Sequence, residues 1–142
     1  MRSLSDQERD RFLQEVRVGV LSVASDPGRP PASMPVWYDY APAGHVRINT
    51  GAASRKARLI RQAGAVTLVV QREAWPYLYV VMEGTVVNTE DPAPRDVREA
   101  MAIRYLGEEG GRAFVESMSD VGSVLFTVRP DRWLTSDFSW GR

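Results

Sequence analysis

Short apolar segments separated by turn-forming residues dominate this chain and limit the folds open to it. Six segments are rich in valine, leucine, isoleucine and aromatic residues and have strand length: residues 18–24, 32–40, 46–50, 66–71, 77–89 and 122–128. Glycine, proline, aspartate and asparagine mark several of the boundaries between them, as is typical of strand connections. Six short strands with few helices predict a mainly β domain in which an antiparallel barrel hides the strand edges.

Local signals refine this pattern. The second strand is expected to bend near Pro35, and Gly84 is expected to form a bulge in the fifth. Residues 132–136 extend the sixth strand beyond Pro130. Three helices are predicted, over residues 6–16, 53–62 and 92–119. Ser5 and Glu8 form a capping box for the first helix, and the third is expected to break at Gly107 or at the glycine pair 110–111.

A basic run follows the third predicted strand. Residues 54–61 read Ser-Arg-Lys-Ala-Arg-Leu-Ile-Arg, with four cations and no acid, and Lys56 is the only lysine of the chain. The cations Arg55 and Lys56 stand at a predicted helix start, where the helix dipole already contributes positive charge. Free N–H groups at a helix start bind phosphate. The run therefore predicts a phosphate site, and the alternative is a solvated helix face.

Composition excludes several function classes. With 142 residues the chain is expected to form one domain, residues 1–142. Its formal net charge of zero gives no general attraction to nucleic acid. It has no cysteine and one histidine, so a zinc–thiolate site, a multi-histidine metal site and thiolate catalysis are not expected. Without a long apolar run or a signal-peptide core, the protein is predicted to be cytoplasmic with no membrane partner.

Four segments in order resemble the pyridoxamine-5′-phosphate-oxidase-like FMN-binding split β-barrel. They are residues 34–37 (Met-Pro-Val-Trp), 48–51 (Ile-Asn-Thr-Gly), the basic run 54–61 and 66–70 (Val-Thr-Leu-Val-Val). The strand 79–85, which contains Glu-Gly, is also similar. The match is closest to the deazaflavin-dependent reductase branch, and it covers residues 10–90 well and 122–136 loosely. The resemblance implies a six-stranded antiparallel split β-barrel.

The resemblance also implies a cofactor and the residues that hold it. The expected cofactor is the reduced deazaflavin coenzyme F-420, with FMN as the alternative. Lys56 would bind the phosphate, with Ser54, Arg55 and Arg58 around it, while Asn49 and Thr50 would lie beside the ribityl chain. The backbone of Met34, Pro35, Val36 and Trp37 would face the ring. Members are homodimers with cofactor sites at the interface, and Tyr79 and Trp133 match positions that a partner chain could contribute.

The expected function is hydride transfer from reduced deazaflavin to a small unsaturated or quinone-like substrate. Residues 135–142 contain no histidine, so the arginine–histidine clamp of vitamin-B6 oxidases is missing. Two alternatives stay open: an FMN-dependent enzyme of the same fold, and a non-catalytic binder of a flavin, haem or similar ligand. No catalytic residue is singled out, because the chain has neither a nucleophile–histidine motif nor a Gly-rich phosphate loop.

Overall fold

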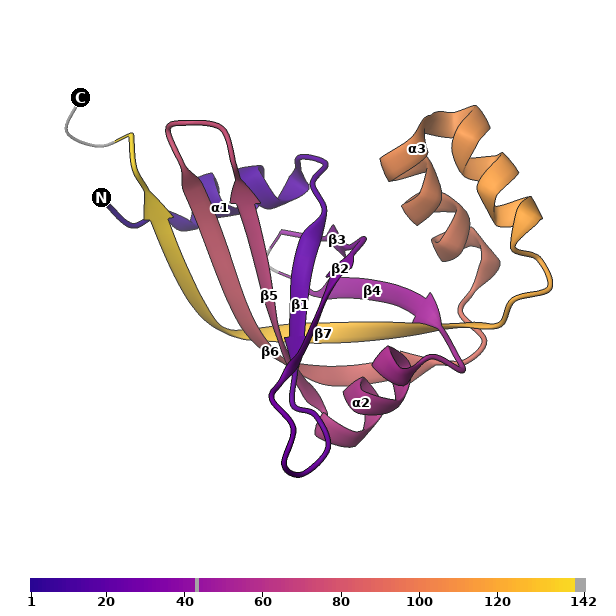
Figure 1. Ribbon diagram of the computed structural model, residues 1–142. Coiled ribbons are helices and arrows are strands. Elements are labelled where there is room, and N and C mark those ends of the chain that lie inside the picture. The colour runs from indigo at the N-terminus through magenta and orange to yellow at the C-terminus, as the bar shows by residue number, and fades with distance from the viewer. Residues whose placement is uncertain (43, 140–142) are drawn as a thin grey trace.

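The computed structural model describes residues 1–42 and 44–139 (Figure 1). Residue 43, in the predicted turn 41–44, and residues 140–142, at the histidine-free C-terminus, lie outside the described residues. The elements in chain order are α1 (Asp6–Gln14), β1 (Gly19–Val23), β2 (Ala32–Val36), β3 (Asp39–Tyr40), β4 (Val46–Gly51), α2 (Arg55–Ala63), β5 (Ala65–Arg72), β6 (Leu78–Glu90), α3 (Arg95–Ser117) and β7 (Ser123–Asp137). The mainly β fold class is confirmed.

In the described residues, an antiparallel sheet of seven strands, in the order β2-β1-β5-β6-β7-β4-β3, forms a curled half-barrel. The expectation of six strands differs because segment 32–40 is not one bent strand. It breaks at Trp37 and Tyr38 into β2 and β3, which lie at opposite edges of the sheet order. Since only two residues join the two edges, the sheet must curl until they approach each other.

Strands β6 and β7 pair along nearly their whole length, from Leu78↔Asp137 to Glu90↔Leu125. The register shifts between Glu83 and Gly84, so the irregularity predicted at Gly84 is present, but the extra residue there is Asp131 of β7 rather than a residue of β6. A β-carbon at Gly84 would lie 2.5 Å from Val128 Cγ1, so glycine is required where the two strands cross closely. The continuous strand β7 also confirms the extension beyond Pro130.

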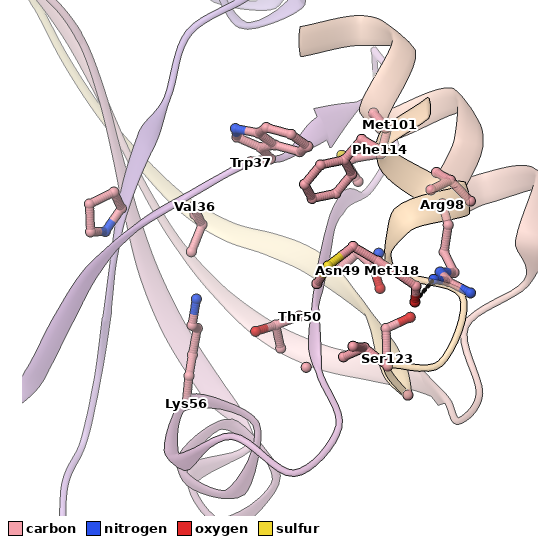
Figure 2. A pocket seen from close by; sticks show the side chains of 16 residues that line it. Val36, Trp37, Asn49, Thr50, Lys56, Arg98, Met101, Phe114, Met118 and Ser123 are labelled. Carbon is pink, nitrogen blue, oxygen red and sulfur yellow. Dashed lines mark hydrogen bonds between the residues drawn. The ribbon is translucent and has the colours of Figure 1, made fainter. Parts of the chain in front are cut away.

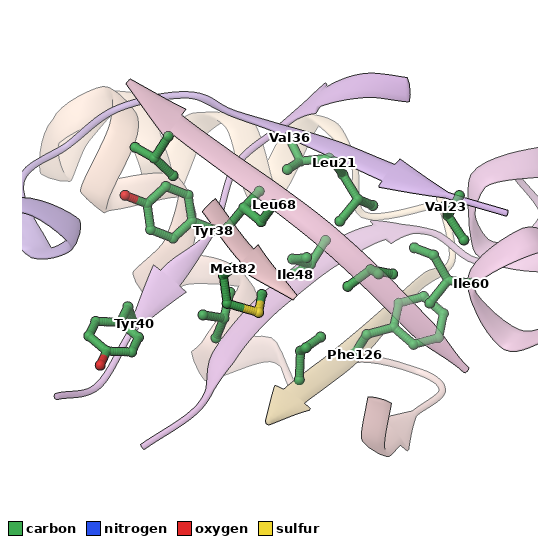
Figure 3. Close-up of a cluster of buried hydrophobic side chains, with 14 of the residues drawn as sticks. Leu21, Val23, Val36, Tyr38, Tyr40, Ile48, Ile60, Leu68, Met82 and Phe126 are labelled. Carbon is green, nitrogen blue, oxygen red and sulfur yellow. The ribbon is translucent and has the colours of Figure 1, made fainter. Parts of the chain in front are cut away.

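The core fills the inside of the curled sheet, because alternate residues of each strand point inward. Leu21, Ile48, Leu68 and Phe126 are among its fully buried side chains (Figure 3). Helix α2 joins this core through Leu59 and Ile60 and ends at Gly64, whose φ of 71° forms a left-handed cap.

Helix α1 begins with the predicted capping box. Ser5 Oγ accepts a hydrogen bond from Glu8 N, and Glu8 Oε1 accepts one from Ser5 N. The helix ends at Gln14 rather than at residue 16. The carbonyl groups at its C-terminal end have a hydrogen-bond donor from another element. The Arg104 guanidinium of α3 donates to the carbonyl oxygens of Leu13, Gln14 and Glu15.

Helix α3 folds into two arms at one side of the sheet (Figure 1). Gly107 has φ 80° and ψ 171°, which confirms a break there. At Gly111 the arms approach so closely that a β-carbon would lie 2.5 Å from Ile103 N. Unlike α2, α3 contributes no side chain to the barrel core. It packs beside the barrel and leaves room for a cavity.

The outer face of the sheet carries an apolar row. Cross-strand pairing aligns Pro35, Val20, Val69, Val81 and Leu134 across five adjacent strands. Val20 is 41% exposed and Leu134 49% exposed. An apolar row across an open sheet face is typical of a surface that another protein covers.

Candidate functional site

A cavity of about 260 Å³ lies between the sheet and α3 (Figure 2). It is lined by Pro35, Val36, Trp37, Asn49, Thr50, Gly51, Lys56, Arg98, Met101, Ala102, Phe114, Val115, Met118, Val121, Gly122 and Ser123. Strands β2 and β4 and the start of β7 supply one side, the first turn of α2 another, and both arms of α3 the third. None of the described residues lining the cavity is acidic.

Six of the twelve predicted cofactor residues line this cavity: Pro35, Val36, Trp37, Asn49, Thr50 and Lys56. They lie far apart in the sequence and are brought together by β2, β4 and α2. Trp37 and Tyr38 take opposite roles, since Tyr38 is fully buried in the core while Trp37 borders the cavity. Whether these residues hold a cofactor stays a prediction.

The other six predicted residues lie elsewhere. Met34 packs against the core, and Ser54 Oγ caps α2 by accepting from Ala57 N. Arg55 and Arg58 point toward the β1–β2 loop. Tyr79 and Trp133 border a separate hollow with Leu134.

Lys56 stands out from the other cations of the basic run. Arg55 donates to Ser25 Oγ at 2.6 Å, Arg58 pairs with Asp26 at 3.0 Å and Arg61 pairs with Asp91 at 2.8 Å. Lys56 is half-buried, points into the cavity in Figure 2, and has no hydrogen-bond or ion-pair partner in the described part of the chain. Burial lowers the pKa of its ammonium group. An anionic ligand would stabilise the charged form of Lys56, which burial destabilises.

Two buried polar atoms at the cavity also lack partners. Within residues 1–42 and 44–139, neither Asn49 Oδ1 nor Ser123 Oγ makes a hydrogen bond. A buried group left unpaired costs about 1–3 kcal/mol. Such atoms at a cavity wall are suited to a ligand with both donors and acceptors.

Sequence reasoning missed the contribution of α3. Met101, Phe114, Val115 and Met118 form an apolar wall, and Arg98 adds a second cation. The predicted break in residues 92–119 implied two arms, but no sequence pattern said which element they would face. Phe114 is 41% exposed and its ring lies 5.4 Å from that of Trp37.

The chemistry available to the cavity is therefore that of an anion site with an apolar wall. Among the described residues no cluster of three histidine, cysteine or carboxylate side chains could hold a metal ion. In the same part of the chain no helix is both long and apolar enough to cross a membrane.

Comparison with known proteins assigns the chain to a family. The model of the pyridoxamine 5′-phosphate oxidase family matches residues 5–137. The chain belongs to that family. The match extends beyond the four segments on which the sequence resemblance rested, and it includes α3 and β7. The family consists largely of oxidoreductases.

Solved structures of other proteins share this fold. A conserved hypothetical protein from Mycobacterium tuberculosis has a TM-score of 0.73 and 20% identity, covering 95% of this chain and 86% of its own. An F420 reductase has a TM-score of 0.70 and 21% identity, covering 88% and 94%. A FAD-binding protein from Mesorhizobium loti has a TM-score of 0.64 and 20% identity, covering 94% and 93%. No curated protein matches the sequence.

Proposed function

We propose that this protein is an oxidoreductase that holds the reduced deazaflavin coenzyme F-420 in the cavity and reduces a small unsaturated or quinone-like substrate. The observation that carries the proposal is Lys56, a half-buried cation at the first turn of α2. Within the described part of the chain it has no partner, and no acidic residue lines the cavity that it faces. Phosphate is the anion that such a position favours.

The lining residues fit the parts of such a coenzyme. Lys56 would hold the phosphate, and the unpaired Asn49 Oδ1 would accept from a ribityl hydroxyl beside Thr50. The ring would lie along the β2 backbone at Val36 and Trp37. When bound, the coenzyme supplies the two electrons as hydride.

The protein would contribute binding, orientation and an apolar wall. Met101, Phe114 and Met118 keep one side of the cavity apolar. No carboxyl, imidazole or phenol group occurs among the described lining residues, so we assign no side chain as a strong general acid. A proton needed by the product would come from water.

A homodimer would complete the site. At about 260 Å³ the cavity falls below the 300–1,000 Å³ typical of ligand pockets, so one chain encloses only part of a large coenzyme. Pro35 belongs to both the cavity lining and the apolar row. A second copy seated on that row would therefore also border the cavity. Its Tyr79 and Trp133 remain candidates for contacts across the interface.

The proposal is tested by titrating the protein with coenzyme F-420, with its phosphate-free core, with FMN and with riboflavin. Lys56→Met should weaken binding of the phosphate-bearing forms by about 1.5–3 kcal/mol, the range for a hydrogen bond to a charged group. The phosphate-free forms should bind Lys56→Met and the unchanged protein alike. Arg58→Met is the matched control, because Arg58 lies on the same helix but pairs with Asp26.

The same titration decides between the two cofactors. Tighter binding of coenzyme F-420, with substrate reduction that consumes no oxygen, supports the deazaflavin proposal. A purified protein carrying stoichiometric FMN that consumes oxygen would replace it with the FMN alternative. Equal phosphate dependence in Lys56→Met and the unchanged protein would remove Lys56 from the site.

A further inference from the structure

The cavity has a second polar end, on the α3 side, that the phosphate does not use. Figure 2 shows Arg98 and Ser123 on the side of the cavity away from Lys56. Arg98 comes from the first arm of α3, and Ser123 is the first residue of β7. Helix α3 and the sheet therefore meet at this end.

Ser123 is buried with a free hydroxyl group. The residue is 8% exposed, and its Oγ has no hydrogen-bond partner among the described residues. Its backbone carbonyl is already used, because it accepts from Ala93 N at 2.9 Å. The hydroxyl is the group left to contact a ligand.

Most N–H donors of Arg98 are not used by other described residues. Its Nη2 donates weakly to the Met118 carbonyl oxygen at 3.5 Å (dashed in Figure 2), and it has no ion-pair partner in the part of the chain that is described. A guanidinium group has five N–H donors and stays charged at any physiological pH. Its planar fork matches a carboxylate, which accepts two parallel hydrogen bonds.

The wall beside Arg98 is apolar. Met101, Phe114 and Met118 line the cavity there, and its two described cations are Lys56 and Arg98. A ligand that suits this end has an apolar body and one planar anionic group. A phosphate is matched less well, since Arg98 acts with only one neutral hydroxyl group, whereas Lys56 stands at a helix start.

We propose that Arg98 and Ser123 form a carboxylate subsite, so that the substrates of this protein are apolar, unsaturated carboxylic acids. Arg98 binds the carboxylate, Ser123 Oγ donates a further hydrogen bond to it, and the side chains of α3 pack against the apolar body. This subsite deepens the proposed function and rests on Lys56 holding the cofactor at the opposite end.

Binding of trans-cinnamate, with cinnamamide as its uncharged counterpart, tests the subsite by calorimetry. The probe is added to the apoprotein and to protein loaded with whichever coenzyme it binds. Arg98→Gln should weaken cinnamate binding about 10- to 150-fold, the equivalent of losing a hydrogen bond to a charged group, and leave cinnamamide binding unchanged. Arg98→Lys, which keeps the charge without the fork, should recover part of the loss.

Arg95→Gln is the matched control, since Arg95 lies one turn earlier on α3, pairs with Glu116 at 3.6 Å and does not line the cavity. It should bind cinnamate like the unchanged protein. Equal cinnamate affinity in Arg98→Gln and the unchanged protein, or tighter binding of cinnamamide than of cinnamate, would overturn the subsite.

Coenzyme titration of Arg98→Gln separates this inference from the proposed function. If this variant binds coenzyme normally and loses cinnamate, both hold. Loss of coenzyme instead of cinnamate would place Arg98 at the cofactor and overturn the subsite. If the unchanged protein binds no coenzyme but its apoprotein binds cinnamate through Arg98, the proposed function fails while the carboxylate site stands.

Discussion

The rings of Trp37 and Tyr105 stack with centroids 4.9 Å apart and planes within 5° of parallel. Trp37 is the link between β2 and β3, and Tyr105 lies on the first arm of α3. The Tyr105 hydroxyl also donates to the Arg17 carbonyl oxygen at 2.7 Å and accepts from Tyr38 N at 3.0 Å. One side chain thus joins α3 to the barrel at the rim of the cavity.

Substitutions at Tyr105 should separate the hydrogen bonds of its hydroxyl group from the stacking of its ring. Tyr105→Phe keeps the ring but leaves Tyr38 N–H without its acceptor, which should cost about 1–3 kcal/mol of unfolding free energy. Tyr105→Leu also loses the stack, worth a further 0.5–1.5 kcal/mol or so. Urea denaturation measures both. A phenylalanine variant as unstable as the leucine variant would mean that the stack adds nothing.

Gly111 and Gly110 provide a matched pair inside α3. Alanine at Gly111 would place its β-carbon 2.5 Å from Ile103 N, whereas at Gly110 the nearest atom is Leu106 Cβ at 3.4 Å. Gly110→Ala should stabilise the protein by roughly 0.5–1 kcal/mol, because alanine is the better helix former. Gly111→Ala should force the arms apart, lower the melting temperature and weaken ligand binding beside Phe114. Similar melting temperatures for both variants would contradict the close approach.

The apolar row predicts the assembly state. Leu134→Glu places a charge at the β7 end of the apolar row and should dissociate a dimer at micromolar concentration, as measured by sedimentation. Arg129→Ala on the same strand is the control, because Arg129 pairs with Asp131, lies opposite Thr85 rather than Val81, and its loss should leave the dimer intact. A monomeric unchanged protein that still binds coenzyme tightly would contradict a shared site.

Lys56 predicts opposite pH effects on binding and on stability. Burial lowers its pKa below 10.5, so the ammonium loses its proton at a lower pH in the folded apoprotein than in the unfolded chain. Phosphate-dependent affinity should fall as pH rises through that lowered pKa, and Lys56→Arg should abolish the fall. The free energy of unfolding of the apoprotein should rise as pH rises from the lowered pKa of Lys56 to its pKa in the unfolded chain. In that range the unfolded state binds more protons than the folded state, so the cost of burying the charge is relieved.

Titrating coenzyme affinity between pH 7.5 and about 10.5 checks the first effect. Urea denaturation of the apoprotein compared with Lys56→Met checks the second. An affinity that falls equally in the Lys56→Arg variant would assign the pH dependence to another group.

Local sequence determined most of the secondary structure. Alternating apolar residues place Leu21, Leu68 and Val70 on the inner face of the sheet, since side chains alternate along any strand. The Ser5–Glu8 capping box was also readable, because it depends on neighbouring residues, whereas the extra residue opposite Gly84 lies on β7 and depends on strand pairing. The strand-to-helix position of the basic run pointed to a phosphate site for the same reason as the capping box.

Only the tertiary structure decided which cation is free. Arg55, Arg58 and Lys56 look equivalent in sequence, but Asp26 lies about thirty residues away and reaches only the two arginines. The break at Trp37 and Tyr38 depends on which strands find β2 and β3 as partners, which no local pattern encodes. That Arg98 and Ser123 line one cavity depends on how α3 packs beside the barrel, a long-range arrangement that hydrophobic periodicity does not specify.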